Sequence, residues 1–141
     1  DSTGDWSSDV CSSDLLGAKR ALPLPVSVPS HCELMRPAAE RFAESIAAIN
    51  WQAPQIPLVQ NVSAAVAADL DTLKRDLLEQ LYKPVRWVES VQTLAANGAT
   101  ELVECGPGKV LAGLNKRCAD GVSTANLNTP DAFAAARAAL A

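Results

Sequence analysis

The 141-residue sequence is poor in aromatic residues, which make up 4% of it, although 48% of its residues are hydrophobic. Few aromatic side chains together with abundant alanine disfavour an all-β fold and favour helices. The net charge is −4 at pH 7. This charge argues against nucleic acid as the main partner, because phosphate binding needs a basic surface.

The sequence also lacks the patterns that mark membrane proteins and metal sites. No apolar run approaches the roughly 20 residues that a membrane-spanning helix needs, and no signal-peptide pattern opens the chain. The cysteines, Cys11, Cys32, Cys105 and Cys118, show no CxxC spacing and predict free thiols in a reducing cytoplasm. With His31 as the only histidine, no metal site is expected.

The first fifteen residues, DSTGDWSSDVCSSDL, differ in composition from the rest of the chain. They are rich in serine and aspartate and show no hydrophobic periodicity. Residues 5–15 resemble the conceptual translation of a short-read sequencing adapter. We therefore interpret residues 1–15 as an adapter translation without regular structure, with a natural flexible tail as the alternative.

From Leu16 onward, short apolar runs alternate with segments of helical periodicity. The runs predict strands or extended segments over residues 20–30, 56–62, 101–105 and 124–127. The periodic segments predict helices over residues 31–50, 71–83 and 84–97, around 110–114, and over 130–141. This alternation predicts an α/β fold, with a layered, mainly parallel sheet flanked by helices.

Local residue signals predict where these helices begin and end. Ser30 and Asp71 are the expected N-caps of the first two helices. Pro84 suits the first turn of the third helix, and Asn97-Gly98 suits its end.

His31 must carry any imidazole chemistry, because the sequence has no second histidine. It lies where the segment 20–30 meets the helix 31–50, and reacting groups collect at the carboxyl ends of strands in open α/β sheets. A neutral imidazole there can act as a general base. A histidine at a helix start can equally be a structural residue satisfied by a backbone carbonyl, and the local pattern leaves both interpretations open.

Two weaker signals remain. The turn Gly106-Pro107-Gly108, followed by Lys109, is similar to a phosphate-binding turn at a helix N-terminus. Its spacing matches neither the P-loop nor GxGxxG, so a tight strand-to-helix turn is the simpler interpretation. Cys32 and Cys105 are poor candidate nucleophiles, because no basic residue flanks Cys105 and Cys32 opens a helix that is expected to pack.

Three segments together resemble one family. They are residues 28–42, VPSHCELMRPAAERF; residues 79–91, EQLYKPVRWVESV; and residues 101–117, ELVECGPGKVLAGLNKR. They are similar to the histidine motif, the glutamine-containing helix junction and the terminal strand-turn-helix of the malonyl-CoA:acyl-carrier-protein transacylases of bacterial fatty-acid synthesis. The resemblance extends over residues 16–141.

The resemblance implies an acyltransferase mechanism. In the family, a serine in a GHSLGE-type motif takes the malonyl group from coenzyme A, and a histidine that matches His31 is its general base. The main-chain carbonyl of a glutamine that matches Gln80 orients this histidine. Malonyl-CoA is then the substrate, and neither a cofactor nor a metal is expected.

The resemblance also implies a C-terminal fragment, because the family's serine and its malonate-binding arginine precede the matched region. No GxSxG motif occurs in the sequence, so we expect the fragment alone to be inactive. Residues 16–30 are expected to return from a missing ferredoxin-like subdomain. Residues 31–141 are expected to form the C-terminal part of the acyltransferase domain, whose core is similar to that of α/β-hydrolases.

An acyl carrier protein is the partner that the resemblance implies, together with the coenzyme A thioester. Carrier proteins are acidic, so a basic docking surface is expected. The candidate contacts lie in or beside the matched motifs and are Lys83, Arg86, Lys109, Lys116 and Arg117. The simpler alternative is a solvated basic face that only balances nearby acids.

Two other functions remain open from the sequence. One is a non-catalytic α/β module that binds carrier protein or coenzyme A, and the other is a hydrolase of related architecture. For all three we expect a cytoplasmic protein without membrane or nucleic-acid contacts.

Overall fold

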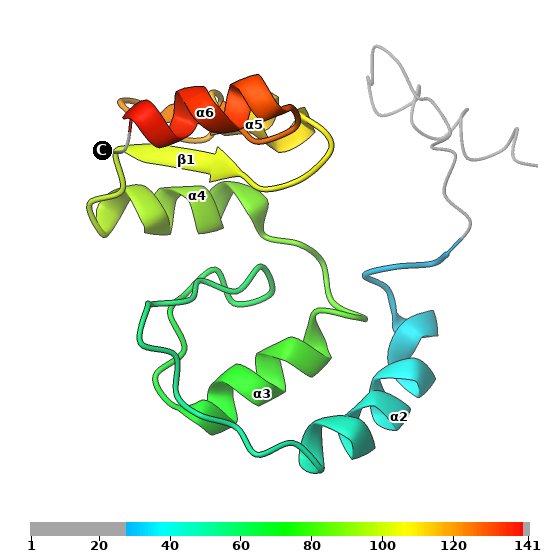
Figure 1. Cartoon of the computed structure of the whole chain (residues 1–141). Coiled ribbons are helices and arrows are strands. Elements are labelled where there is room, and N and C mark those ends of the chain that lie inside the picture. The colour runs from blue at the N-terminus through cyan, green and yellow to red at the C-terminus, as the bar shows by residue number, and fades with distance from the viewer. Residues whose placement is uncertain (1–27, 140–141) are drawn as a thin grey trace, which may run out of the picture.

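The computed structural model describes residues 28–139, which form two groups of elements (Figure 1). The first group contains α2 and α3, and the second contains α4, the strands, α5 and α6. The element bounds are Glu33–Met35 (η1, a 3-10 helix), Arg36–Ala47 (α2), Leu70–Glu79 (α3), Trp87–Ala96 (α4), Glu101–Glu104 (β1), Val110–Asn115 (α5), Ser123–Asn126 (β2) and Pro130–Ala139 (α6).

The two strands form a parallel sheet in which Glu101 pairs with Ser123 and Glu104 with Asn126. Parallel strands need a crossover connection, and α5 provides it. Both α5 and α6 contact β2. The strands expected around residues 101–105 and 124–127 are therefore confirmed, and with them the α/β fold.

Helices α2 and α3 contact each other, and each buries one stripe of its surface. In α2 the buried residues are Ala39 and Ile46, which are 4% and 3% exposed, whereas Glu44 faces solvent. In α3, Leu73 is buried and only 6% exposed. Ile46 and Leu73 are thus buried as the helical periodicity predicts, whereas Leu34 and Phe42 of the first periodic segment are 76% and 39% exposed.

A turn over residues 59–66 connects the two groups of elements. The side-chain Nε2 of Gln60 donates to the carbonyl of Leu73 on α3, at 3.1 Å. The carbonyl of Ala64 accepts a hydrogen bond from Oγ1 of Thr93 on α4, at 2.7 Å. Because Gln60 is buried, this turn is a structural link between α3 and α4 and not only a surface loop.

The first helix begins later than expected, and the prediction that Ser30 caps it is wrong. His31 has a left-handed backbone, with φ of 61°, so the chain is not yet helical there. The 3-10 turn starts at Glu33 and the α-helix at Arg36, without a side-chain cap at either start. A proline, Pro37, in the first turn of α2 favours this later start because its fixed φ suits the helix.

The sequence predicts Asp71 as the N-cap of α3, and this prediction is wrong because the N-cap is Asp69. The backbone of Asp69 is extended, and its Oδ1 accepts the N–H of Thr72 at 2.7 Å. Hydrogen bonding to this amide lowers the pKa of the Asp69 carboxyl. Asp71 instead lies in the first turn, where its negative charge favours the helix N-terminus.

Helix α4 begins at Trp87 and not at Pro84, which corrects another expectation. The N–H of Arg86 is used outside the helix, because it donates to the carbonyl of Asn61 at 2.7 Å. The predicted end of α4 is confirmed. Gly98 follows the C-cap residue with φ of 91°, a left-handed conformation that glycine adopts without strain.

The buried strand expected over residues 56–62 is absent. Only a single antiparallel bridge joins Val59 to Val66, and Ile56 is 80% exposed. Pro57 has no N–H to donate to a neighbouring strand, and β1 and β2 pair only with each other in the described part of the chain. A short apolar run without a partner strand forms a loop.

The interpretations of residues 1–15 and 16–27 lie outside the described residues, and residues 28–30 form no strand. Between residues 28 and 139, no helix has the length and apolarity to cross a membrane.

The packing of α2 predicts a measurable difference between two isoleucines. Ile46 is 3% exposed and Ile56 is 80% exposed. Ile46→Val should lower the free energy of unfolding by about 0.5–1.5 kcal/mol, because it removes a buried methyl group. Ile56→Val is the matched control and should change it by less than about 0.5 kcal/mol. Equilibrium urea denaturation measures both, and equal effects would contradict this packing.

Candidate active site at His31

His31 lies at the exposed junction before η1, and its backbone is anchored to the end of α3. Its N–H donates to the carbonyl of Leu81 at 3.0 Å. Its φ of 61° is uncommon for a residue with a side chain, although histidine tolerates this region better than most residues. The anchor to Leu81 holds the residue in a conformation that an isolated chain would rarely adopt.

The imidazole of His31 points at the same turn. Its Nδ1 lies 2.7 Å from the main-chain oxygen of Gln80. A carbonyl oxygen can only accept, so Nδ1 must be the protonated nitrogen of this pair. In the neutral ring the lone pair then lies on Nε2, which is the nitrogen free to take a proton. This geometry is what a general base requires.

Gln80 can accept this bond because of its position in α3. It is the C-cap residue, and the last carbonyls of a helix have no amide donor from a following turn. Its side chain is turned the other way, with Nε2 donating to Leu77 at 3.3 Å. The main-chain oxygen, not the amide side chain, therefore meets His31. The expected pairing of His31 and Gln80 is present, and their catalytic roles remain predictions.

A second contact joins the start of α2, just after His31, to the end of α3, just after Gln80. The guanidinium of Arg36 lies 4.0 Å from the centre of the Tyr82 ring. Arg36 also donates twice to the Glu33 carboxylate, at 2.7 and 2.8 Å. These hydrogen bonds lower the pKa of Glu33 and raise the pKa of Arg36. Sequence reasoning missed Arg36 and Tyr82, although both lie inside the matched motifs and within five residues of a predicted site residue.

The five expected basic contacts differ in how they are engaged. Lys83 pairs with Glu79 at 2.8 Å. Arg86 pairs with Glu89 at 2.9 Å, which raises the pKa of the arginine and lowers that of the glutamate. Lys109, Lys116 and Arg117 are exposed, and none of the three forms an ion pair within residues 28–139.

The turn Gly106-Pro107-Gly108 leads from β1 into α5, as the sequence predicts. The backbone N–H of Ala112 in α5 donates a hydrogen bond to Oε2 of Glu104, at 2.8 Å. A carboxylate beside these amides would repel a phosphate. The arrangement therefore favours the tight-turn interpretation. The sequence pattern did not reveal that Glu104 accepts a hydrogen bond from the α5 backbone.

The three cysteines between residues 28 and 139 show no catalytic arrangement. Sγ of Cys32 donates to the carbonyl of Pro29 at 3.1 Å, Cys118 is buried, and Cys105 is exposed. All three are free thiols, whereas Cys11 lies outside the described residues. Over residues 28–139 no group of three or more histidine, cysteine or acidic side chains could hold a metal.

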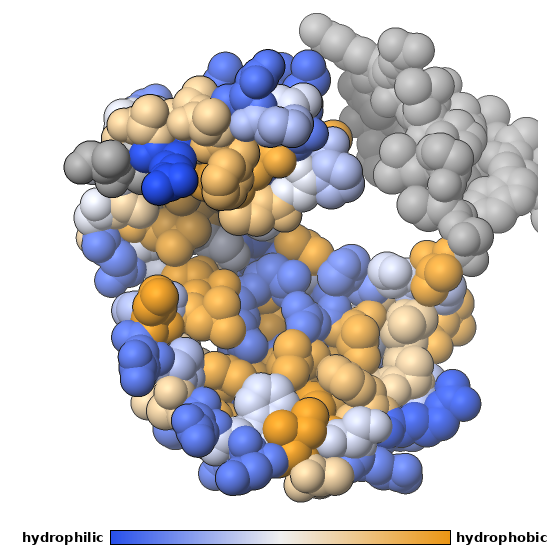
Figure 2. All heavy atoms as spheres, in the orientation of Figure 1, coloured by the Kyte–Doolittle hydropathy of each residue, from blue (hydrophilic) through white to orange (hydrophobic). Residues whose placement is uncertain are grey.

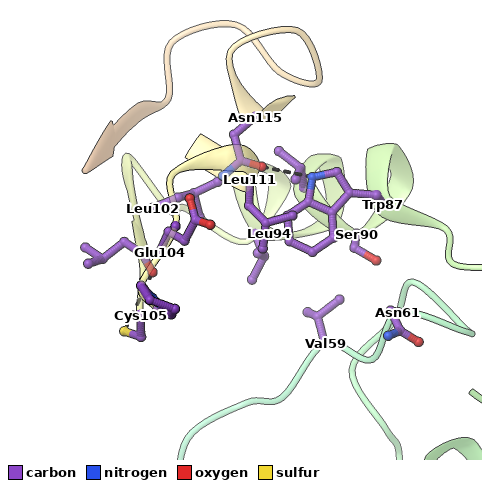
Figure 3. A pocket seen from close by; sticks show the side chains of 15 residues that line it. Val59, Asn61, Trp87, Ser90, Leu94, Leu102, Glu104, Cys105, Leu111 and Asn115 are labelled. Carbon is purple, nitrogen blue, oxygen red and sulfur yellow. Dashed lines mark hydrogen bonds between the residues drawn. The ribbon is translucent and has the colours of Figure 1, made fainter. Parts of the chain in front are cut away.

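A cavity of about 440 Å³ lies between α4, the sheet and the turn 59–66 (Figure 3). Much of its wall is apolar and comes from Trp87, Leu94, Leu102 and Leu111. Nε1 of Trp87 donates to Oδ1 of Asn115 at 3.0 Å on one side. Neither His31 nor Gln80 lines this cavity. Figure 2 shows hydrophobic side chains around the hollow between the two groups of elements.

The left-handed backbone of His31 predicts an unusual order of stabilities. At this φ, alanine has a steric cost that glycine avoids. The free energy of unfolding of His31→Gly should therefore exceed that of His31→Ala by about 1 kcal/mol. At Glu44, an exposed position within α2, the order should reverse, with glycine less stable than alanine by about 0.5–1 kcal/mol. Urea denaturation of the four variants tests this, and the same order at both positions would disprove the left-handed geometry.

Comparisons with known proteins agree on one family, although no family model matches the chain. The malonyl CoA-acyl carrier protein transacylase of Escherichia coli K12 is 52% identical over 120 residues, which is 85% of this chain and 39% of that protein. The transacylase of Bacillus subtilis 168 is 46% identical over 115 residues, covering 82% of this chain and 36% of that protein. The chain thus spans about two fifths of the length of these relatives.

Solved structures give the same result. The malonyl-CoA:acyl carrier protein transacylase of Xanthomonas oryzae matches 92% of this chain and 41% of its own, with a TM-score of 0.86 and 46% identity. A malonyl-transacylase in complex with its type II PKS acyl-carrier protein matches 89% of this chain and 41% of its own, with a TM-score of 0.83 and 43% identity. On this evidence of sequence and fold together, the chain is similar over most of its own length to malonyl-CoA:acyl-carrier-protein transacylases and spans about two fifths of theirs.

Proposed function

We propose that this chain forms the histidine-bearing part of a malonyl-CoA:acyl-carrier-protein transacylase of fatty-acid synthesis, a cytoplasmic enzyme. The observation that supports the proposal is the 2.7 Å contact between Nδ1 of His31 and the main-chain oxygen of Gln80. This contact leaves Nε2 as the basic nitrogen, on an exposed residue that a second reacting group can approach.

In the proposed reaction, His31 serves both halves of a transfer through an acyl-serine. Nε2 takes the hydroxyl proton while the serine oxygen attacks the malonyl thioester, and the imidazolium returns the proton to the coenzyme A thiolate as it leaves. In the second half, Nε2 takes the proton of the carrier-protein thiol as the sulfur attacks the acyl-serine. The imidazolium returns this proton to the serine oxygen as the bond between the acyl group and that oxygen breaks. The Gln80 carbonyl orients the ring throughout and stabilises its transient positive charge.

A non-catalytic module that binds carrier protein or coenzyme A is the second candidate function, and a hydrolase is the third. Binding alone needs no free Nε2, so a module would bind carrier protein or coenzyme A equally well after replacement of His31 and would transfer no malonyl group. A hydrolase would pass the malonyl group to water instead of to a thiol. Carrier-dependent turnover separates the transacylase from both.

The carrier protein is the proposed macromolecular partner, with coenzyme A thioester as the acyl donor. Among the five basic candidates, Lys109, Lys116 and Arg117 have the better claim to contact an acidic surface. They are exposed and form no ion pair in the described part of the chain, whereas Lys83 and Arg86 already pair with acids of this chain. Free cations steer an acidic partner more strongly than neutralised ones.

A chimeric enzyme tests the catalytic role of His31. Residues 16–141 would replace the matching segment of the Escherichia coli relative, to which the chain is 52% identical. His31→Ala in this chimera should lower malonyl transfer to carrier protein roughly 10²–10⁴-fold, because it removes the general base. The transfer is measured with purified malonyl-CoA and carrier protein.

Two controls accompany the chimera. Gln80→Ala should stay within a few-fold of the parent, because it keeps the main-chain oxygen that meets His31. The 141-residue chain alone should show no transfer above its own His31→Ala variant. A chimera that folds and transfers malonyl equally well with and without His31 would refute the proposed role.

Charge reversal tests the proposed docking surface in the same chimera. Lys116→Glu combined with Arg117→Glu should raise the KM for carrier protein, and added salt should shrink the difference by screening the charges. The KM for malonyl-CoA should change little. Arg41→Glu combined with Arg137→Glu makes the same change in net charge on exposed residues of α2 and α6 and should have a smaller effect. Equal effects of the two pairs would exclude the assignment.

A further inference from the structure

We propose that Arg36 and Tyr82 form a latch that positions His31 for catalysis; this inference rests on the proposed function. Each latch residue lies close in sequence to one partner of the hydrogen bond between His31 and Gln80. Arg36 is the first residue of α2, five positions after His31, and Tyr82 follows Gln80 and Leu81 at the end of α3. A contact between them therefore closes a small loop around the bond between His31 and Gln80.

The backbone of His31 needs such support. Its φ of 61° is a left-handed conformation with a steric cost, and the residue is exposed, so burial does not hold it. Two hydrogen bonds hold it locally, from its N–H to Leu81 and from its Nδ1 to Gln80. Both acceptors belong to the same turn, so any shift of that turn relative to α2 would break both bonds together.

The latch resists this shift. The Arg36 guanidinium lies 4.0 Å from the centre of the Tyr82 ring, within the range of a cation–π contact. Arg36, Tyr82, Ala39 and Leu78 line one small hollow between α2 and α3, so the ring lies where the two helices meet. The contact therefore ties the start of α2 to the end of α3.

Glu33 orients the cation of the latch. Its two carboxylate oxygens accept from Nε and Nη2 of Arg36, at 2.7 and 2.8 Å. A two-point contact of this kind restrains the plane of the guanidinium, which a lysine could not reproduce. Glu33 lies in η1, so the pair also keeps the turn that follows His31 in place.

Hydrogen exchange of the His31 amide in the full 141-residue chain tests the latch without reference to activity. Tyr82→Leu and Arg36→Gln should each speed this exchange roughly two- to fivefold, the size expected for an exposed cation–π contact. Tyr82→Phe keeps the ring face and should exchange like the parent. Arg41→Gln, another exposed arginine of α2, is the matched control and should have no effect.

The same variants in the chimeric enzyme test the link to catalysis. Tyr82→Leu should lower kcat by a similar factor with little change in the KM for malonyl-CoA, and Tyr82→Phe should restore kcat. Unchanged exchange in both Tyr82→Leu and Arg36→Gln would overturn the latch, as would faster exchange with an unchanged kcat. A folded parent chimera that transfers no malonyl would instead overturn the proposed function, and the exchange data would still decide whether the latch exists.

Discussion

The hydrogen bond between Nδ1 of His31 and the main-chain oxygen of Gln80 joins residues that are 49 positions apart in sequence. Its requirements shape the surrounding structure. Gln80 ends a helix, where the last carbonyls have no intrahelical amide donor and remain free to accept. His31 must precede a helix at a left-handed turn, so that its ring reaches back to α3. The site is therefore made where one helix begins and another ends.

Using a backbone carbonyl instead of a carboxylate has a consequence for the chemistry. A carboxylate can be removed by one substitution, whereas the carbonyl of residue 80 persists with any side chain. The position of the carbonyl then depends on how α3 is held. Gln60 fastens α3 to the turn 59–66, and α2 also contacts α3. Packing at a distance from His31 thereby decides whether its ring has an acceptor.

The sequence predicted the elements whose signals are local. The strands near residues 101–105 and 124–127 and the end of α4 at Gly98 need only their own residues to be recognised. The local sequence signals failed where the three-dimensional arrangement of the backbone and the helices selects one residue among several. Asp69 and Asp71 are chemically identical as caps, and only the extended backbone of Asp69 selects it. The contact of Arg36 with Tyr82 depends on the packing of α2 against α3, which no local pattern encodes.

The tautomer of His31 tests the central claim most directly, and the sequence makes the measurement simple because it holds one histidine. A long-range proton–nitrogen NMR spectrum of the ¹⁵N-labelled chain, taken where the imidazole is neutral, resolves its two ring nitrogens without assignment of other histidines. The account predicts the proton on Nδ1 and an unprotonated Nε2. A neutral ring with its proton mainly on Nε2 would contradict the hydrogen bond to Gln80 and the role of His31 as a general base.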